Sequence, residues 1–382
     1  MALLSSAPAN DYQTLTQRLL GINWLLLALV TGLALTGIAM LYSAGEGFDP
    51  WASRQAMRYA VCVLIMLAVA VIDLRLVLKL AYLIYFITLA LLIGVEAMGS
   101  IGMGAQRWID LGLIRIQPSE LMKIALVLAL ARYFHGCTHL DLGKLTMMVP
   151  PLLLAAVPIA LVLKQPDLGT AGMLGLGAAM VFFVAGVRLW MFGIAVAAFA
   201  ATAPVAWTLL HEYQRQRVLT FLEPELDPLG SGYHILQSQI ALGSGGLFGR
   251  GFMQGTQSHL SFLPEKQTDF VFTMLAEEFG LVGGLTLIAL YMMVIAFCVA
   301  IAMRAHNQFG RILALGIAST LFLYVFINIA MVMGLLPVVG IPLPLISYGG
   351  TAMMTVMVGI GLVMNVYINR DLRIGRRHDE QD

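Results

Sequence analysis

Long apolar segments recur along most of this 382-residue chain and define its predicted elements. A helix needs about 20 apolar residues to cross the hydrocarbon core of a bilayer. The pattern therefore predicts an all-α polytopic membrane protein, with a single membrane domain over residues 1–382. By that measure ten segments are predicted to span the membrane: residues 22–43, 57–73, 77–95, 118–135, 146–163, 168–187, 189–210, 281–303, 311–335 and 348–368.

The composition of the chain supports a membrane protein and narrows its partners. Hydrophobic residues make up 60% of the chain and charged residues only 11%, whereas soluble domains carry roughly 25% charged residues. The formal net charge of +1 argues against a nucleic-acid partner. The three cysteines, Cys62, Cys137 and Cys298, are scattered along the chain and indicate no disulfide framework.

The distribution of Lys and Arg predicts the orientation of the chain, because cytoplasmic loops carry the excess of positive charge. Ten spans place both termini on one side, and residues 1–20 read as a short cytoplasmic leader rather than a signal peptide. Five basic residues fall in the opposite short loops: Arg54, Arg58, Arg107, Arg115 and Lys164. Twelve fall on the terminal side, which is therefore expected to be cytoplasmic: Arg18, Arg75, Lys79, Arg132, Lys144, Arg188, Arg304, Arg311, Arg370, Arg373, Arg376 and Arg377.

One connection, at residues 211–280, is much longer than the others and is expected to face outward between the seventh and eighth spans. Long loops are usually functional, and its mix of turn signals and apolar runs predicts short amphipathic helices on the outer membrane surface. Its last part, 269–279, is expected to form a separate short helix or an extension ending at Gly280. Thr268 or Asp269 is expected to cap the N-terminus of that helix.

Ionisable residues at membrane depth suggest a functional site, and the first such cluster lies at the start of the fourth span. Pro118 suits a first helical turn, and Glu120 and Lys123 then share one helix face. Mutual neutralisation of a buried pair explains both residues without any chemistry, whereas their place beneath a loop with Arg107 and Trp108 favours function.

Two further clusters are expected on the same outward side. Asp167 begins the sixth span, where a helix cap is the simpler interpretation of its position. Asp269 is followed by Glu277 and Glu278, but eight helical residues place Glu277 about 12 Å along the axis, so these are not a close carboxylate pair. The glycine-rich GSGGLFGRG at 243–251 fits no nucleotide-binding pattern.

Basic residues complete the candidate site. Arg215 and Arg217 open the long loop, and arginine forks suit phosphate oxygens, while Lys123 can hold a phosphate as a point charge. Cations, carboxylates and apolar walls at the outer leaflet fit a lipid with a phosphate head group. These residue types do not distinguish moving the lipid from reacting it.

Five segments in the right order resemble the SEDS family of bacterial cell-wall proteins, named for shape, elongation, division and sporulation. The sequence GTQSHLSFLPEKQTDF resembles the elongation branch of the family more than the division branch. The resemblance covers nearly the whole chain and is carried by AQRWIDLGLIRIQPSELMKI at 105–124, KQPDLGTA at 164–171, YQRQRVLTFLEPELDPLGSGYHILQSQIALGSGGLFGRG at 213–251, GTQSHLSFLPEKQTDFVFTMLAEEFGLVG at 255–283 and PLPLISYGGT at 342–351.

The resemblance implies ten spans and a peptidoglycan glycosyltransferase that polymerises lipid II outside the bacterial cytoplasmic membrane during cell elongation. It also implies a class B penicillin-binding protein and other elongation-complex proteins as partners, and dependence on a divalent cation such as Mg²⁺ or Mn²⁺, whose ligands are unknown. The family's essential aspartate matches Asp269. Its other functional residues match Trp108, Glu120, Lys123 and Asp167.

Under this interpretation Asp269 is a general base that takes a proton from the attacking sugar hydroxyl, or else a ligand of the cation. Lys123, Arg215, Arg217 or a divalent cation would stabilise the pyrophosphate leaving group, and Glu120 would keep Lys123 charged. Two alternatives are a lipid II flippase and a scaffold that recruits a penicillin-binding protein. The outward position of the clusters favours chemistry outside the membrane.

Overall fold

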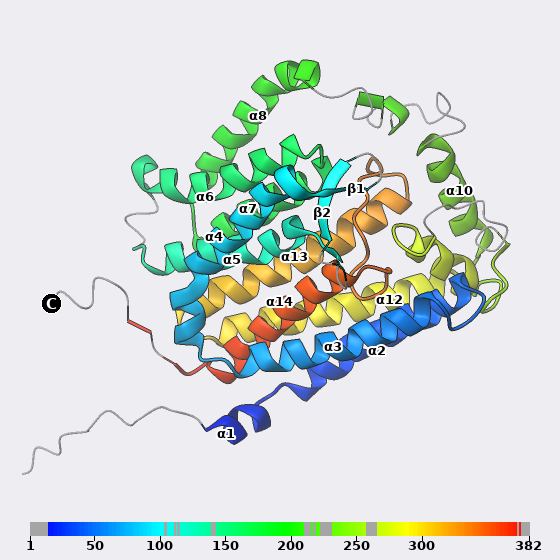
Figure 1. Cartoon of the computed structure of the whole chain (residues 1–382), viewed down its shortest axis with the longest axis horizontal. Coiled ribbons are helices and arrows are strands. Elements are labelled where there is room, and N and C mark those ends of the chain that lie inside the picture. Colours follow the sequence, from blue (N-terminus) through cyan, green and yellow to red (C-terminus); the bar gives the residue numbers. More distant parts are fainter. Residues whose placement is uncertain are drawn as a thin grey trace, which may run out of the picture.

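A computed structural model describes residues 14–102, 105–110, 112, 115–138, 143–209, 215–216, 219–221, 231–256, 266–372 and 374–375 of the chain. Helices dominate it and run along one another as a bundle (Figure 1). The elements are α1 (Leu15–Leu20), α2 (Trp24–Ala44), α3 (Trp51–Val71), α4 (Leu74–Met98), β1 (Ser100–Gly102), β2 (Ala105–Asp110), β3 (Arg115–Ile116), α5 (Pro118–His135), α6 (Leu145–Lys164), α7 (Leu168–Ala185), α8 (Leu189–Leu209), α10 (Ser231–Ser244), α12 (Val271–Arg304), α13 (Gln308–Val332) and α14 (Gly350–Ile368).

Each of the ten predicted spans contains a helix, but only some of these helices are long and apolar enough to cross a membrane. Within the described residues eight qualify by length and composition: α2, α3, α4, α6, α7, α12, α13 and α14. The helix α5 differs because it carries Glu120, Lys123 and Arg132. In α8 the qualifying apolar stretch is the shorter Leu189–Thr202. The helix α3 starts at Trp51, earlier than the predicted boundary at residue 57.

The core of the bundle lies where α5, α13 and α14 pack against their neighbours (Figure 1). The helix α5 is buried over most of its length between α4, α6, α7, α13 and α14. Glycines allow the closest approaches: a methyl group on Gly361 of α14 would sit 2.7 Å from the carbonyl oxygen of Met66 in α3. Small residues at such contacts are typical of membrane helices, which gain stability from close packing rather than from the hydrophobic effect.

A small sheet corrects the prediction of an all-α fold. The strands β1, β2 and β3 form an antiparallel meander between α4 and α5. Strand β2 carries Arg107 and Trp108 and pairs with β3, which leads through Gln117 into Pro118, the first residue of α5. The sheet therefore places Arg107 and Trp108 next to the start of α5, the helix that holds Glu120 and Lys123.

The predicted break at Gly280 is present, and it explains the glycine-rich segment. Gly280 has φ +68° and ψ −164° within α12. The N–H groups of Leu281 and Val282, which follow the break, donate to the carbonyls of Gly246 and Leu247 at 2.9 and 3.1 Å. Side chains at Gly245 or Gly249 would collide with the backbone of α12. The segment 245–251 thus braces the break through its backbone, and only glycine fits at positions 245 and 249.

The helix α10 departs from the expected arrangement of the long loop. It packs against α12 and α13, with Ile235, Ser238 and Ala241 buried. The hydroxyl of Ser238 donates to the carbonyl of Val332 at 2.8 Å and pairs with that of Thr273. This part of the loop is therefore fixed to the bundle by a specific face, rather than only resting on a membrane surface.

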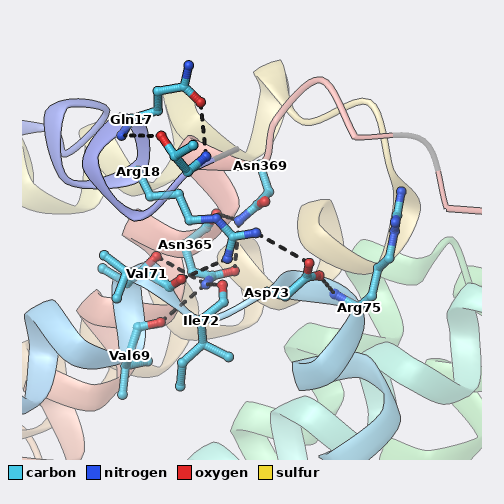
Figure 2. A network of polar contacts seen from close by, with 11 residues as sticks. Gln17, Arg18, Val69, Val71, Ile72, Asp73, Arg75, Asn365 and Asn369 are labelled. Atoms are coloured by element: carbon cyan, nitrogen blue, oxygen red, sulfur yellow. Dashed lines mark hydrogen bonds and ion pairs between the residues drawn. The ribbon is translucent and has the colours of Figure 1, made fainter. Parts of the chain in front are cut away.

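At the opposite end from the Gly280 break, polar side chains bind the turn between α3 and α4 to neighbouring helices (Figure 2). Asn365 of α14 donates to the carbonyls of Val69, Ala70 and Ile72. Arg18 of α1 donates to the carbonyl of Val71 at 2.8 Å and to Asp73 at 3.4 Å. These bonds satisfy main-chain carbonyls left without partners where α3 ends.

Candidate active site at one end of the bundle

Asp269 lies half-buried in the turn 266–270, directly before α12. The prediction that Thr268 or Asp269 caps this helix is wrong, because the N-cap residue is Phe270 and no side chain caps the helix. The carbonyl of Asp269 instead accepts a hydrogen bond from the amide of Asn328 in α13 at 3.1 Å. The start of α12 is therefore tied to α13 through the main chain of Asp269.

The loop between α13 and α14 fixes the residues before Asp269. The hydroxyl of Ser347 donates to the carbonyl of Thr268, and the N–H of Tyr348 donates to the carbonyl of Gln267 at 2.8 Å. The amide of Gln55 in α3 holds this loop in turn by donating to the carbonyl of Ser347 at 3.0 Å. The loop between α13 and α14 thus holds the turn directly, and α3 supports that loop.

The same loop places the Asp269 carboxylate near the start of α7. A methyl group on Gly340 would sit 3.5 Å from Oδ2 of Asp269, so the carboxylate lies against that part of the loop. A methyl group on Gly169 of α7 would sit 2.7 Å from the carbonyl oxygen of the adjacent Val339. The N-terminus of α7 and the Asp269 carboxylate therefore both lie against the adjacent residues Val339 and Gly340.

Asp167 caps α7, as its position predicted. It accepts hydrogen bonds from the backbone N–H of Thr170 at 3.1 Å and from the hydroxyl of Thr170 at 3.0 Å. Arg107 of β2 reaches across to this helix start, with its Nε 3.7 Å from Oδ2 of Asp167. Its guanidinium also donates to the carbonyl of Pro166 at 2.8 Å. Arg107 keeps 24% of its side chain exposed, so this cation is accessible beside the loop.

Glu120 and Lys123 form a closed group with a third residue, Tyr324 of α13. The ammonium of Lys123 donates to Glu120 at 2.7 Å and to the hydroxyl of Tyr324 at 2.7 Å, and that hydroxyl donates to the other oxygen of Glu120. Glu120 and Lys123 are each only 3% exposed. A buried pair needs such additional bonds to offset the cost of removing two charges from water.

The helix α13 joins this buried group to the Asp269 turn. Tyr324 and Asn328 are four residues apart on one helix face, about 6 Å along its axis. Tyr324 bonds to Glu120 and Lys123, and Asn328 bonds to Asp269. One turn of helix therefore separates Tyr324, which bonds to the ion pair, from Asn328, which bonds to the main chain of Asp269.

The remaining predicted residues have other surroundings. Trp108 is half-buried in β2 opposite Ser100. Arg215 donates to the carbonyls of Trp207 and Thr208 at the end of α8, a helix at the edge of the bundle (Figure 1). Arg217 lies outside the described residues. Glu277 and Glu278 are fully buried, and they accept hydrogen bonds from Thr256 and Ser43.

The described residues contain no cluster of side chains that would hold a divalent cation by themselves. In that part of the chain no three Asp, Glu, His or Cys side chains gather closely enough to hold a metal ion. Mg²⁺ and Mn²⁺ take several oxygen ligands, whereas Asp269 contributes one carboxylate beside a backbone loop. Because Mg²⁺ is commonly held by one or two carboxylates together with substrate phosphates, the cation role of Asp269 stays a prediction.

Tyr324, Asn328, Ser347 and Gln55 are site residues that the sequence reasoning did not single out. Gln55 lies among other polar residues of α3, and Ser347 lies in an apolar loop, so no local pattern marks either position. Asn328 and Tyr324 share a signal that was available, since their spacing of four places two polar side chains on one face of an otherwise apolar helix.

The site lies at one end of a bundle in which eight of the described helices are long and apolar enough to cross a membrane, so the fold is that of a polytopic membrane protein. Residues 16–372 match the family of cell cycle proteins comprising FtsW, RodA and SpoVE, and the chain belongs to that family.

Similar proteins with assigned names extend this finding. Peptidoglycan glycosyltransferase MrdB of Escherichia coli K12 is 46% identical over 349 residues, which cover 91% of this chain and 94% of that protein. Peptidoglycan glycosyltransferase RodA of Treponema pallidum is 32% identical, with 89% of this chain and 96% of that protein covered.

Solved structures share the fold. A chain from a peptidoglycan synthase complex that coordinates polymerization and crosslinking superposes with a TM-score of 0.80 at 32% identity, covering 92% of this chain and 99% of that chain. The rod shape determining protein RodA of Thermus thermophilus superposes with a TM-score of 0.70 at 29% identity, covering 92% and 98%.

Proposed function

We propose that this chain is a peptidoglycan glycosyltransferase that polymerises lipid II, the undecaprenyl-pyrophosphate-linked disaccharide-pentapeptide, into glycan strands during cell elongation. The observation that carries the proposal is the presentation of Asp269. Hydrogen bonds from α13 and from the loop between α13 and α14 hold the carbonyls of its turn, while the residue itself stays half-buried. Whole-length similarity to MrdB supports both the reaction and the elongation role.

The proposed topology keeps ten spans in one membrane domain over residues 1–382, with α5 and α8 crossing alongside the eight apolar helices. A buried ion pair allows α5 to cross, because Glu120 and Lys123 neutralise each other inside the protein. Both termini would then be cytoplasmic, as the positive charges predict. Asp269 and the long loop would face the outside of the cytoplasmic membrane of a bacterium.

In the proposed reaction Asp269 acts as the general base. The sugar hydroxyl of the acceptor attacks the anomeric carbon of the donor, and its proton passes to the Asp269 carboxylate as the new C–O bond forms. The bond from that carbon to the lipid pyrophosphate breaks, and the pyrophosphate leaves with the electron pair. A positioned base of this kind typically contributes roughly 10²–10⁴-fold to the rate.

Arg107 is the side chain best placed to stabilise the leaving pyrophosphate. It is accessible, permanently charged and next to the loop on which the Asp269 carboxylate lies. Lys123 is buried and neutralised, so its role is to support α13 through Tyr324 rather than to touch phosphate. The proposed steps use only side chains of this chain, and a divalent cation bound with the substrate would add positive charge at the pyrophosphate.

The proposed partners are a class B penicillin-binding protein and other proteins of the elongation complex. A similar chain belongs to a synthase complex that couples polymerization to crosslinking, and the match covers nearly all of both chains. A flippase and a scaffold are the competing functions. Neither one requires a carboxylate held half-exposed at one end of the bundle.

The test is polymerisation of fluorescent lipid II by the full chain in complex with its penicillin-binding partner. Asp269→Asn preserves shape and removes the base, so we expect at least a 100-fold slower reaction. Asp110→Asn is the matched control, since Asp110 is an exposed carboxylate in the sheet before α5. Undiminished polymerisation by folded Asp269→Asn would exclude the base. A wild-type complex that moves lipid II across vesicles without polymerising it would instead favour the flippase.

A further inference from the structure

The position of the Asp269 carboxylate is set from outside its own segment. Its helix begins at Phe270, whose side chain makes no capping hydrogen bond. The direct hydrogen bond from another helix to the Asp269 backbone comes from Asn328. The bonds from Ser347 and Tyr348 hold the two preceding residues.

Asn328 makes two bonds with one atom. Its Nδ2 donates to the carbonyl of Asp269 at 3.1 Å and to the carbonyl of Ile341 at 2.7 Å. The side chain is fully buried. An atom that faces two carbonyl oxygens must be the amide nitrogen, which has two donors, and not the oxygen, which has none.

The two carbonyls belong to two segments that lie next to the Asp269 carboxylate. One belongs to Asp269 itself, and the other belongs to Ile341, the neighbour of the Gly340 against which the carboxylate rests. A single amide therefore fixes both the backbone that carries the carboxylate and the loop that forms its wall. Loss of the amide would remove one hydrogen bond from each of the two segments.

We propose that Asn328 is the positioning residue for Asp269, setting the carboxylate relative to the sugar hydroxyl that it deprotonates. This inference rests on the proposed role of Asp269 as general base. Asn328 does not touch the substrate, because its side chain is buried behind the turn. Displacement of a catalytic group by about 1 Å can slow a reaction roughly 100-fold, so Asn328 should act on the rate of the chemical step.

The chain offers a matched control in Asn365. It is also fully buried, lies in α14 and donates to three main-chain carbonyls at the opposite end of the bundle (Figure 2). Replacing either asparagine with leucine keeps the branching and removes the donors. Both variants leave buried carbonyls unpaired, so both should lose stability, and only one of them lies near Asp269.

The experiment measures polymerisation of fluorescent lipid II by the complex with the penicillin-binding partner, with kcat and KM corrected for the folded fraction. For Asn328→Leu we expect kcat to fall about 10- to 100-fold while KM for lipid II changes less than about threefold. For Asn365→Leu we expect an equal or larger drop in the thermal midpoint and an unchanged kcat. Asn328→Ser and Asn365→Ser, which keep one donor, carry the same comparison where a leucine variant is not recovered.

Equal kcat values for the two variants would overturn the inference, as would a loss in Asn328→Leu that falls entirely on KM. Asp269→Asn, measured in the same series, separates this failure from failure of the proposed function. If Asp269→Asn is inactive while Asn328→Leu behaves like Asn365→Leu, the base assignment stands and only the positioning role is rejected. If Asp269→Asn is fully active, the base assignment itself is rejected.

Discussion

The two ends of the helical bundle use the same device for different purposes. At one end Asn365 donates to carbonyls of the turn between α3 and α4, and at the other Asn328 donates to carbonyls of the Asp269 turn and the Ile341 loop. The first turn is built into a network of helix caps and carbonyl bonds (Figure 2). The second turn presents a half-exposed carboxylate. A buried amide thus fixes a turn at each end. At the Asn365 end the fixed turn stabilises the fold, and at the Asn328 end it holds the residue proposed to act in the reaction.

The largest difference between the two ends is expected when the buried ion pair of Glu120 and Lys123, near the Asp269 end, is broken. Lys123→Met leaves the Glu120 carboxylate buried and unpaired, so we expect a loss of about 3–5 kcal/mol in the free energy of unfolding. Adding Glu120→Gln removes the orphaned charge and should recover most of that loss. Thermal unfolding of the purified single and double variants measures both effects. A double variant no more stable than Lys123→Met would contradict this account of the pair.

A smaller effect is expected at the opposite end. Arg18→Met removes the bond to the carbonyl of Val71 and the ion pair with Asp73, and a partly exposed interaction of this kind contributes about 1 kcal/mol. We expect a slightly lower thermal midpoint and an unchanged rate of lipid II polymerisation. A severalfold fall in the rate of the folded protein would break the division of roles between the two ends.

The smallest effect is expected at the exposed sheet. The N–H of Gly112 and then the Arg115 side chain hold the pKa of Asp110 below its ordinary value of 3.8. A lowered pKa in the folded state means that the charged form stabilises the fold at neutral pH. This contribution is lost as pH falls below about 4, through the folded-state pKa. Asp110→Asn should therefore differ slightly from wild type in thermal midpoint at neutral pH and match it in acid. A difference that grows in acid would reverse the sign of this assignment.

The sequence was sufficient to predict most of the helices and the break in α12. Runs of about 20 apolar residues mark membrane helices strongly, Pro118 marks the start of α5, and Gly280 marks a residue whose backbone conformation excludes a side chain. The sheet was missed because its strands are short and their pattern is weaker than the apolar segments on either side.

The candidate site was predictable only in part, because its contacts are long-range. Asp269, Arg107 and Asp167 carry charge and stand out in an apolar chain. Tyr324 is 201 residues from Lys123, and Asn328 is 59 residues from Asp269. Nothing local marks either one as a partner. The glycines at 243–251 also had no apparent role until they were seen against the backbone of α12.

The break at Gly280 has a mechanical consequence. Because the segment 245–251 accepts hydrogen bonds from the N–H groups of Leu281 and Val282, the break is braced and is not a free hinge. The nine residues from Val271 to Phe279 therefore do not continue the axis of the longer part of α12. A force applied along that long part, for instance by a partner packed on it, would meet the braced break before it reached Asp269. The Asp269 carbonyl is held by Asn328 of α13. A tilt of α12 alone should therefore leave the Asp269 carboxylate in place.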